Sequence, residues 1–374
     1  MGECHSEIAR WMEPLGVQVR IDAAGNLRAV YPGREPRAPR LLIGSHLDTV
    51  PNAGAYDGIL GVMLAVALLG ALRGRGLPFA IEVVGFSEEE GVRFGTPFIG
   101  SRALVGRFDE NLLNVCDVQG ISVGKAIENF GLRPEEIPQC GIKDDVLGYL
   151  EFHIEQGPVL EKLNLPLGAV EAIAGQGRLE FSFVGRANHA GTTPMHLRRD
   201  AVAGAAEWIG VVEREAGETP GLVATVGKIE AVPGAVNVIA AEVRLSRDLE
   251  SHRTYAERRA HEIAARRGLT GRQNVLLDQS AVAMDSFLTR EIERAIVSTG
   301  CKPHTMVSGA GHDAMILAEK VPAGMIFLRT PGGISHDPAE SVAVEDVECA
   351  IECGLHLLDQ LASSPAFLTR MKRA

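Results

Sequence analysis

The chain has 374 residues, of which 46% are hydrophobic and 23% are charged. This length and composition are typical of a globular protein with two domains, each with its own core. Lys and Arg number 37 against 48 Asp and Glu, and the net charge of -11 argues against nucleic acid or an anionic membrane surface as a partner. We therefore expect a small polar molecule as the ligand.

Neither a membrane span nor a disulfide framework is expected. The longest apolar stretch, residues 59–72, is shorter than the roughly 20 residues that a membrane-spanning helix needs. The N-terminal residues carry acids, whereas a leader peptide is basic and then apolar. The six cysteines include no Cys-x-x-Cys pair, and a chain of this length does not need disulfides for stability. We predict a cytoplasmic protein with free thiols.

Strand and helix patterns alternate in the first half of the chain. Apolar runs predict strands at 41–45, 80–87 and 149–157 and a helix at 60–72. This alternation predicts an α/β fold with a mainly parallel sheet. Ligands of such sheets bind beyond the carboxyl ends of the strands.

The pattern changes between residues 175 and 283. It predicts a β-α-β-β-α-β order typical of a ferredoxin-like α+β unit. The elements are strand 177–185, helix 200–215, strands 222–230 and 237–246, helix 254–267 and strand 274–282. The α/β pattern then resumes with helix 290–298, strand 322–328 and helix 344–361. We predict a discontinuous catalytic domain, 1–174 and 284–374, with an inserted domain at 175–283.

Several potential metal ligands follow or close the predicted strands. They are His46, the acids of residues 88–90, His153 and, after strand 322–328, His336. Neutral imidazole and carboxylate suit Zn²⁺, Mn²⁺ or Co²⁺, which favours a site for two divalent ions.

Two aspartates near His46 fit this hypothesis. Asp57 follows across a loop, and its carboxylate could bridge two ions roughly 3.5 to 4 Å apart. Asp48 could accept the second N–H of His46. The alternative is a hydrogen-bonded core histidine and a solvated acidic loop. Three adjacent acids directly after an apolar strand are nevertheless costly unless a cation compensates them.

A set of segments resembles one enzyme family. They are GSHLDTV, AYDGILG, FSEEEGVRF, EFHIEQGPVLE, GRANHAGTTPM, GAVNVI, SGAGHDAM and GGISHDPAE. In this order, over nearly the whole chain, they resemble the hydantoinase/carbamoylase amidases of the M20 metallopeptidase clan. That branch includes N-carbamoyl-L-amino-acid hydrolases, allantoate amidohydrolases and β-ureidopropionases. His153 stands where the peptidase relatives have a carboxylate.

The resemblance implies a ligand for each metal position. His46 and His153 would bind one ion, Glu90 and His336 the other, and Asp57 would bridge the two. These five side chains are the predicted metal ligands.

The resemblance also implies a general base and a mechanism. Glu89, the acid before the ligand, would take a proton from a water activated by the two ions and then protonate the leaving nitrogen. The extra acid Glu88 leaves open a register shifted by one residue.

Further residues are implied to bind substrate. His189 would come from the partner subunit and stabilise the oxyanion, in a homodimer formed through the inserted domain, whose motion would close the site as a lid. Gln156 and Asn237 match positions that touch substrate. His312 is a further candidate, against the alternative that Asp313 caps a helix with a hydrogen-bonded histidine beside it.

The chain departs from the family pattern at two places. Glu250 stands where an arginine that binds the substrate carboxylate is expected. Either Arg247 or Arg253 replaces that arginine, or the far end of the substrate is neutral or cationic. Family members usually have a few dozen residues before the segment that begins here at Met1, which indicates a shortened start.

The leading hypothesis is a dinuclear-metal amidohydrolase acting on a linear, non-peptide C–N bond, as in an N-carbamoyl amino acid, allantoate or a similar ureido compound. An M20-type aminoacylase or dipeptidase is the alternative enzyme, and His153 argues against it. A metal-free binding or scaffold protein is the alternative of another class. The presence of all five ligand candidates argues against that reading.

Overall fold

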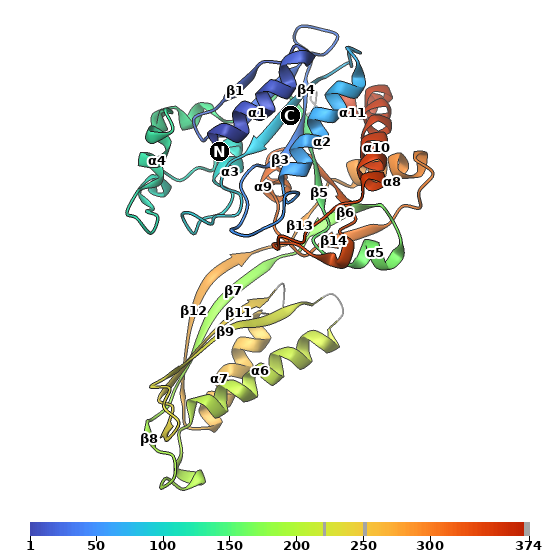
Figure 1. Ribbon diagram of the computed structural model, residues 1–374. Coiled ribbons are helices and arrows are strands. Elements are labelled where there is room, and N and C mark those ends of the chain that lie inside the picture. The colour runs from blue at the N-terminus through green and yellow to red at the C-terminus, as the bar shows by residue number, and fades with distance from the viewer. Residues whose placement is uncertain (220–221, 250–252, 370–374) are drawn as a thin grey trace. The chain divides into compact units, whose positions relative to one another are not determined.

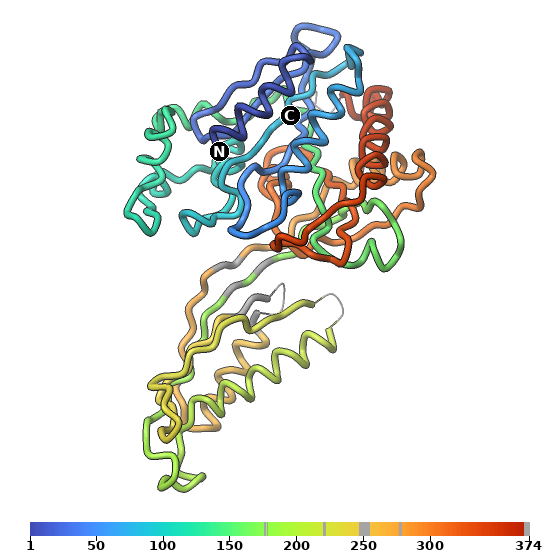
Figure 2. The backbone as a smooth tube through the Cα atoms, in the orientation of Figure 1, coloured from blue at the N-terminus to red at the C-terminus, as the bar shows by residue number. Residues whose placement is uncertain are grey.

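The computed structural model describes residues 1–219, 222–249 and 253–369. The chain divides into two compact units, one made of Met1–Ile173 and Val282–Ala374 and the other of Ala174–Ala281. In Figure 2, the first unit contains the blue and red ends of the colour scale, and the second contains the middle of the chain.

A mixed nine-stranded sheet forms the centre of the first unit, in the order β1-β2-β4-β3-β5-β15-β6-β13, with β14 paired to β6. The strands are β1 (Val19–Ile21), β2 (Leu27–Tyr31), β3 (Arg40–His46), β4 (Ala80–Phe86), β5 (Val146–Ile154), β6 (Leu167–Ile173), β13 (Val282–Ala283), β14 (Thr305–Ser308) and β15 (Ala323–Leu328). The four central strands β4, β3, β5 and β15 run parallel, so their carboxyl ends meet at one edge. The predicted α/β fold is confirmed.

Helices cover this sheet (Figure 1). They are α1 (Gly2–Met12), α2 (Ile59–Leu72), α3 (Ile99–Val105), α4 (Val123–Asn129), α5 (Val159–Leu163), α8 (Ser286–Ser298), α9 (Asp313–Leu317), α10 (Val344–Ser363) and α11 (Pro365–Leu368). Helix α2 carries no charged residue, because it packs against β3 and β5 and also against α10. No helix among the described residues is long and apolar enough to cross a membrane.

The second unit has its own antiparallel sheet, in the order β12-β7-β11-β9. Its elements are β7 (Gln176–Val184), β8 (Asn188–His189), α6 (Ala201–Glu218), β9 (Ala224–Val232), β10 (Val238–Ile239), β11 (Glu242–Leu249), α7 (Arg253–Arg266) and β12 (Thr270–Gln279). Both α6 and α7 pack on one face of the sheet, where Phe181, Phe183 and Trp208 are fully buried. This is the strand order of the predicted ferredoxin-like unit.

The structure divides the predicted strand 237–246 into two. β10 pairs with β8, whereas β11 joins the four-stranded sheet between β7 and β9. The segment changes partners at Ala240 and Ala241, because β8 lies outside that sheet and offers a separate pairing edge. A pattern of apolar residues indicates which side chains are buried, but it does not indicate which strand is the pairing partner. The sequence therefore could not show that this segment divides into β10 and β11.

Candidate metal centre

The carboxyl ends of two neighbouring strands position a pair of histidines. His46 is the last residue of β3 and His153 the second-last of β5, and these strands are adjacent and parallel. The loop before α2 brings Asp57 to them. Gly58 is required in this loop, because its φ is 69° and a Cβ there would lie 2.3 Å from Nδ1 of His46.

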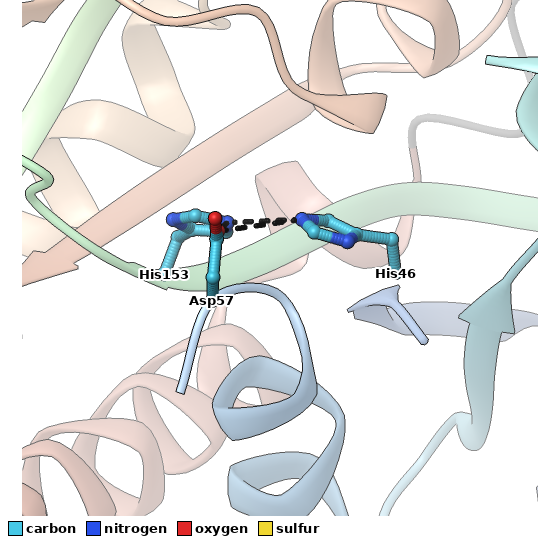
Figure 3. A group of neighbouring side chains, drawn as sticks. All are labelled: His46, Asp57 and His153. Atoms are coloured by element: carbon cyan, nitrogen blue, oxygen red, sulfur yellow. Dashed lines mark hydrogen bonds and ion pairs between the residues drawn. The ribbon is translucent and has the colours of Figure 1, made fainter. Parts of the chain in front are cut away.

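His46, Asp57 and His153 form the first group of potential metal ligands, and all three are buried (Figure 3). Nε2 of His46 lies 3.3 Å from Nε2 of His153. Oδ1 of Asp57 lies 3.2 Å from Nε2 of His153 and 3.7 Å from Nε2 of His46. One imidazole nitrogen from each ring and one carboxylate oxygen therefore converge on a single point.

The second nitrogen of each imidazole, Nδ1, is hydrogen-bonded to a backbone carbonyl. This leaves Nε2 of His46 and of His153 directed at the point where the three ligand atoms meet. Nδ1 of His46 lies 2.8 Å from the carbonyl oxygen of Asp48, and Nδ1 of His153 lies 2.9 Å from that of Ile154. A carbonyl only accepts, so each Nδ1 carries a proton, and Nε2 is the nitrogen through which each ring can bind a cation. Oδ1 of Asp57 is buried and has no hydrogen-bond donor within the described part of the chain. Such converging acceptors are stable together when a cation lies among them.

Asp57, Glu90 and His336 form a second group. Oδ2 of Asp57 lies 3.0 Å from Nε2 of His336, which in turn lies 3.6 Å from Oε1 of Glu90. Oε1 of Glu90 is also buried without a hydrogen bond from any described residue. The ligand atoms of each group lie within 4.8 Å of one another, and the two oxygens of Asp57 serve one group each. The donor set therefore fits two divalent cations joined by a carboxylate.

The carboxylate of Asp57 is held in its ionised form. Burial by itself raises its pKa, but the neighbouring imidazoles of His153 and His336 outweigh burial and hold the pKa well below its usual range. Burial also lowers the pKa of His46, which keeps that imidazole neutral. Both effects suit metal ligands, since an anionic carboxylate and a neutral imidazole are the forms that bind a cation.

The backbone and side chain of Asp48 have different partners. Its carboxylate accepts the backbone N–H groups of Glu89 and Glu90, both at 3.0 Å. The predicted contact with His46 is made by the carbonyl oxygen instead, and the carboxylate is 4.0 Å from Nδ1. Asp48 is therefore the predicted partner of the second N–H of His46, through its carbonyl oxygen, because the acidic loop offers two backbone donors to its carboxylate.

The three adjacent acids separate in the structure. Glu90 joins the second group, whereas Oε2 of Glu89 lies 4.0 Å from Nε2 of His46. Glu88, at a φ of 54°, lines a cavity of about 120 Å³ together with Phe94 and Phe130. Burial, followed by the charge on Asp313, raises the pKa of Glu89 well above its usual value. Of the three adjacent acids, Glu89 is therefore the one whose buried surroundings suit a proton acceptor.

Two further candidates lie next to the ligand groups. Nε2 of Gln156 donates to Oδ2 of Asp57 and to Oγ of Ser335, both at 3.2 Å. The buried ring of His312 stands edge-on to His153, with the ring centroids 4.5 Å apart, and its Nε2 lies 2.9 Å from Oγ of Ser308. The alternative role for Asp313, a helix cap, is wrong, because α9 begins without a side-chain capping bond.

Comparisons with known proteins identify the family of this chain. Residues 42–360 match the family described as Peptidase family M20/M25/M40. The N-carbamoyl-L-amino acid amidohydrolase of Geobacillus stearothermophilus is 40% identical over 366 residues, which cover 95% of this chain and 90% of that protein. The chain belongs to the hydantoinase/carbamoylase amidases of the M20 family. The allantoate deiminase of Arabidopsis thaliana is 38% identical, over 95% of this chain and 75% of that protein.

Solved structures of this amidase family share the fold. A hydantoinase/carbamoylase family amidase of Burkholderia multivorans superposes with a TM-score of 0.88 at 32% identity, covering 96% of this chain and 90% of that one. AtUAH, solved in complex with (S)-hydroxyglycine, gives a TM-score of 0.81 at 31% identity and covers 96% and 90% of the two chains.

Within this M20-family chain, His189 and Asn237 belong to the second unit. His189 in β8 pairs with Val238 of β10, and the carbonyl of Asn237 accepts the N–H of Ala190 at 2.9 Å. Both residues are exposed. The structure therefore brings these two predicted substrate-binding residues together, on a different unit from the potential metal ligands. Glu250 lies outside the described residues.

Two acids that form hydrogen bonds beside the candidate metal centre were not predicted. Oε1 of Glu340 accepts the N–H groups of Tyr56 and Asp57, at 2.9 and 3.1 Å, and Oε2 accepts from Ser335. Glu340 thus joins the loop of Asp57 to the loop of His336. The fully buried Glu151 accepts from Ser45 and from the N–H of Ala314, both at 2.8 Å. The sequence could have indicated Glu151, because it lies two residues before His153 and therefore on the same face of β5.

We expect metal affinity to increase with pH around neutrality. Burial and the charge of Asp57 raise the pKa of Glu90 to about 7, and the hydrogen bond with Asp57 raises that of His336. Each group must lose its proton to bind a cation, so protons compete with the metal below about pH 7 and binding releases protons. Calorimetric titrations of the metal-free protein with Mn²⁺ in two buffers of different ionisation enthalpy measure this release. Equal affinity at about pH 6 and about pH 8 would contradict it.

Proposed function

We propose that this chain is a dinuclear-metal amidohydrolase that hydrolyses a linear, non-peptide C–N bond, in an N-carbamoyl amino acid, allantoate or a similar ureido compound. The observation that carries the proposal is Asp57, whose two carboxylate oxygens each face a separate group of potential ligands. The names of the relatives, an N-carbamoyl-L-amino acid amidohydrolase and allantoate deiminases, support this substrate class.

His46 and His153 would hold one ion and Glu90 and His336 the other, with Asp57 shared between them. When bound, the ions would polarise the carbonyl group of the substrate and lower the pKa of a water. The donor set suits Zn²⁺, Mn²⁺ and Co²⁺ alike.

Glu89 would act as the general base. It would take a proton from the attacking water and deliver it to the leaving nitrogen, so that ammonia or an amine departs neutral. Burial raises the pKa of Glu89 well above its usual value, so its carboxylate accepts a proton more readily than an exposed glutamate does. The N–H bonds to Asp48 hold the backbone of the acidic loop in place for this transfer.

Substrate assays test this proposal against its alternatives. The purified protein, metal-loaded or chelated, is tested with N-carbamoyl amino acids, allantoate and N-acetyl amino acids. Metal-dependent release of ammonia from the ureido substrates alone is expected. Preferred cleavage of N-acetyl amino acids or dipeptides would favour an M20-type aminoacylase or dipeptidase, and a lack of turnover with any metal would favour a binding protein. Glu250 is the proposed reason for any preference against a substrate whose far end carries a carboxylate.

The second unit would provide the remaining substrate contacts. We propose that His189, with Asn237 beside it, stabilises the oxyanion in the site of the partner subunit of a homodimer, and that Gln156 and His312 contact substrate within the subunit. The exposure of His189 and Asn237 on a unit separate from the metal ligands supports this arrangement.

Complementation between two inactive variants tests the shared site. His189→Ala and Glu89→Gln are each expected to lose activity as homodimers. In a mixed dimer, the subunit with intact Glu89 would receive the intact His189 of its partner, so one of the two sites works. Subunit exchange at equal concentrations should restore about a quarter of wild-type activity, because about half of the dimers are mixed. Lack of recovery, with mixed dimers verified by mass spectrometry, would place His189 within its own subunit's site or outside catalysis.

A further inference from the structure

Two cysteines far from each other in sequence come together away from the metal centre. Sγ of Cys301 lies 3.7 Å from Sγ of Cys349, although 48 positions separate the two residues. Cys301 follows the turn at the end of α8, and Cys349 lies in the second turn of α10. These two helices pack against each other (Figure 1). The contact therefore joins two packed elements of the first unit.

Both thiols are accessible to a small reagent. Each of the two side chains is only partly buried, at the edge of the main hydrophobic core. Cys353, one helical turn after Cys349, is fully buried and so cannot be reached by the same reagent. Of the thiols in this cluster, the partly exposed pair is therefore the reactive one.

We propose that Cys301 and Cys349 form a reversible dithiol–disulfide site that reacts with low-molecular-weight disulfides. The sulfur atoms need to approach from 3.7 Å to about 2.05 Å for the bond to form. Both cysteines are free in the structure, which therefore corresponds to the reduced form of the site.

The reaction proceeds by two exchange steps. The thiolate of Cys301 attacks one sulfur of the reagent disulfide, forms a mixed disulfide and releases the first reagent thiolate. The thiolate of Cys349 then attacks Sγ of Cys301 and releases the second. The two protons from the cysteines go to the two leaving thiolates, and the reagent takes up the two electrons that the protein loses. Burial raises the pKa of Cys349 to about 11, so little of its thiolate is present near neutral pH, and the second, intramolecular step becomes faster as the pH rises.

The disulfide would close a loop that contains part of the metal centre. His312, β15 and His336 all lie between Cys301 and Cys349 in the chain. A cross-link constrains the unfolded chain more than the folded one, so the oxidised protein should resist unfolding. Neither cysteine contacts a ligand group, so turnover should be unchanged.

The experiment uses the metal-loaded full chain treated with glutathione disulfide at about pH 8. The cross-link should remove two of the six thiols titrated under denaturing conditions, with a mass loss of about 2 Da for the two hydrogens removed, whereas reaction of the exposed Cys116 adds the mass of a glutathione instead. The half-life of thermal inactivation should rise several-fold, with kcat unchanged, and a thiol reductant should reverse both changes.

Three variants assign the bond. Cys301→Ser and Cys349→Ser should each keep all five remaining thiols or gain only a glutathione adduct, whereas Cys353→Ser should still lose two. A bond to Cys353 in the wild-type protein, seen in fragment spectra of the peptides, would overturn the proposal. So would glutathione adducts on Cys301 that never resolve into a cross-link.

Discussion

Replacing Glu89 by glutamine should lower kcat by roughly 10²–10⁴-fold, because a carboxamide cannot take a proton from the attacking water. The side chain is buried, and its carboxyl Oε2 lies 4.0 Å from Nε2 of His46. Glutamine has nearly the same shape, and it carries no charge that burial penalises. Metal content, measured by inductively coupled plasma mass spectrometry, and KM should therefore remain close to those of the wild-type protein.

Glu88→Gln is the matched control for this change. Glu88 is the neighbouring acid and undergoes the same chemical substitution, but its side chain lines a separate cavity with Phe94 and Phe130. We expect its kcat to stay near the wild-type value. If Glu88→Gln were inactive and Glu89→Gln active, the acidic loop would be used in a register shifted by one residue.

Replacing Asp57 by asparagine should remove activity by preventing both ions from binding. Oδ1 faces His46 and His153, and Oδ2 faces His336, so a single carboxylate serves both groups. An amide offers one oxygen and one NH₂ group, and the NH₂ group cannot bind a cation. Metal content should fall from about two ions per chain to below one, and turnover should fall at least as far as in Glu89→Gln.

The control for this variant is Asp337→Asn. Asp337 is exposed in the loop that carries His336, where its carboxylate accepts the N–H of Ala339 at 2.8 Å. The same substitution there should leave metal content and turnover near normal. Retention of both ions by Asp57→Asn would remove Asp57 as the bridging group. The remaining ligands would then have to hold two ions without a shared carboxylate.

The sequence predicted the strand ends of the candidate site. Apolar runs directly before His46, before the three acids and before the loop of His336 marked three strands. Because β3, β4 and β15 run parallel with β5, their carboxyl ends meet at one edge of the sheet. The grouping of these residues therefore followed from local patterns and one rule of sheet geometry.

The sequence did not predict the hydrogen bonds that orient these groups. Glu340 lies 283 positions from Asp57, and Glu151 lies 163 positions from Ala314, yet each pair is hydrogen-bonded. The carbonyl of Asp48, rather than its carboxylate, faces His46 for a similar reason, since the acidic loop supplies the donors for the carboxylate. Such choices depend on which buried donors remain free after folding.

By itself, the sequence determined the alternation of strands and helices, the inserted unit and the residue types of a metal centre. These features follow from the spacing of apolar residues and from the identity of the side chains at strand ends. Only the tertiary structure decided that β10 pairs with β8, that each oxygen of Asp57 faces its own group, and that Cys301 meets Cys349. Local patterns report which faces are buried, whereas contacts between distant segments depend on how those buried faces pack together.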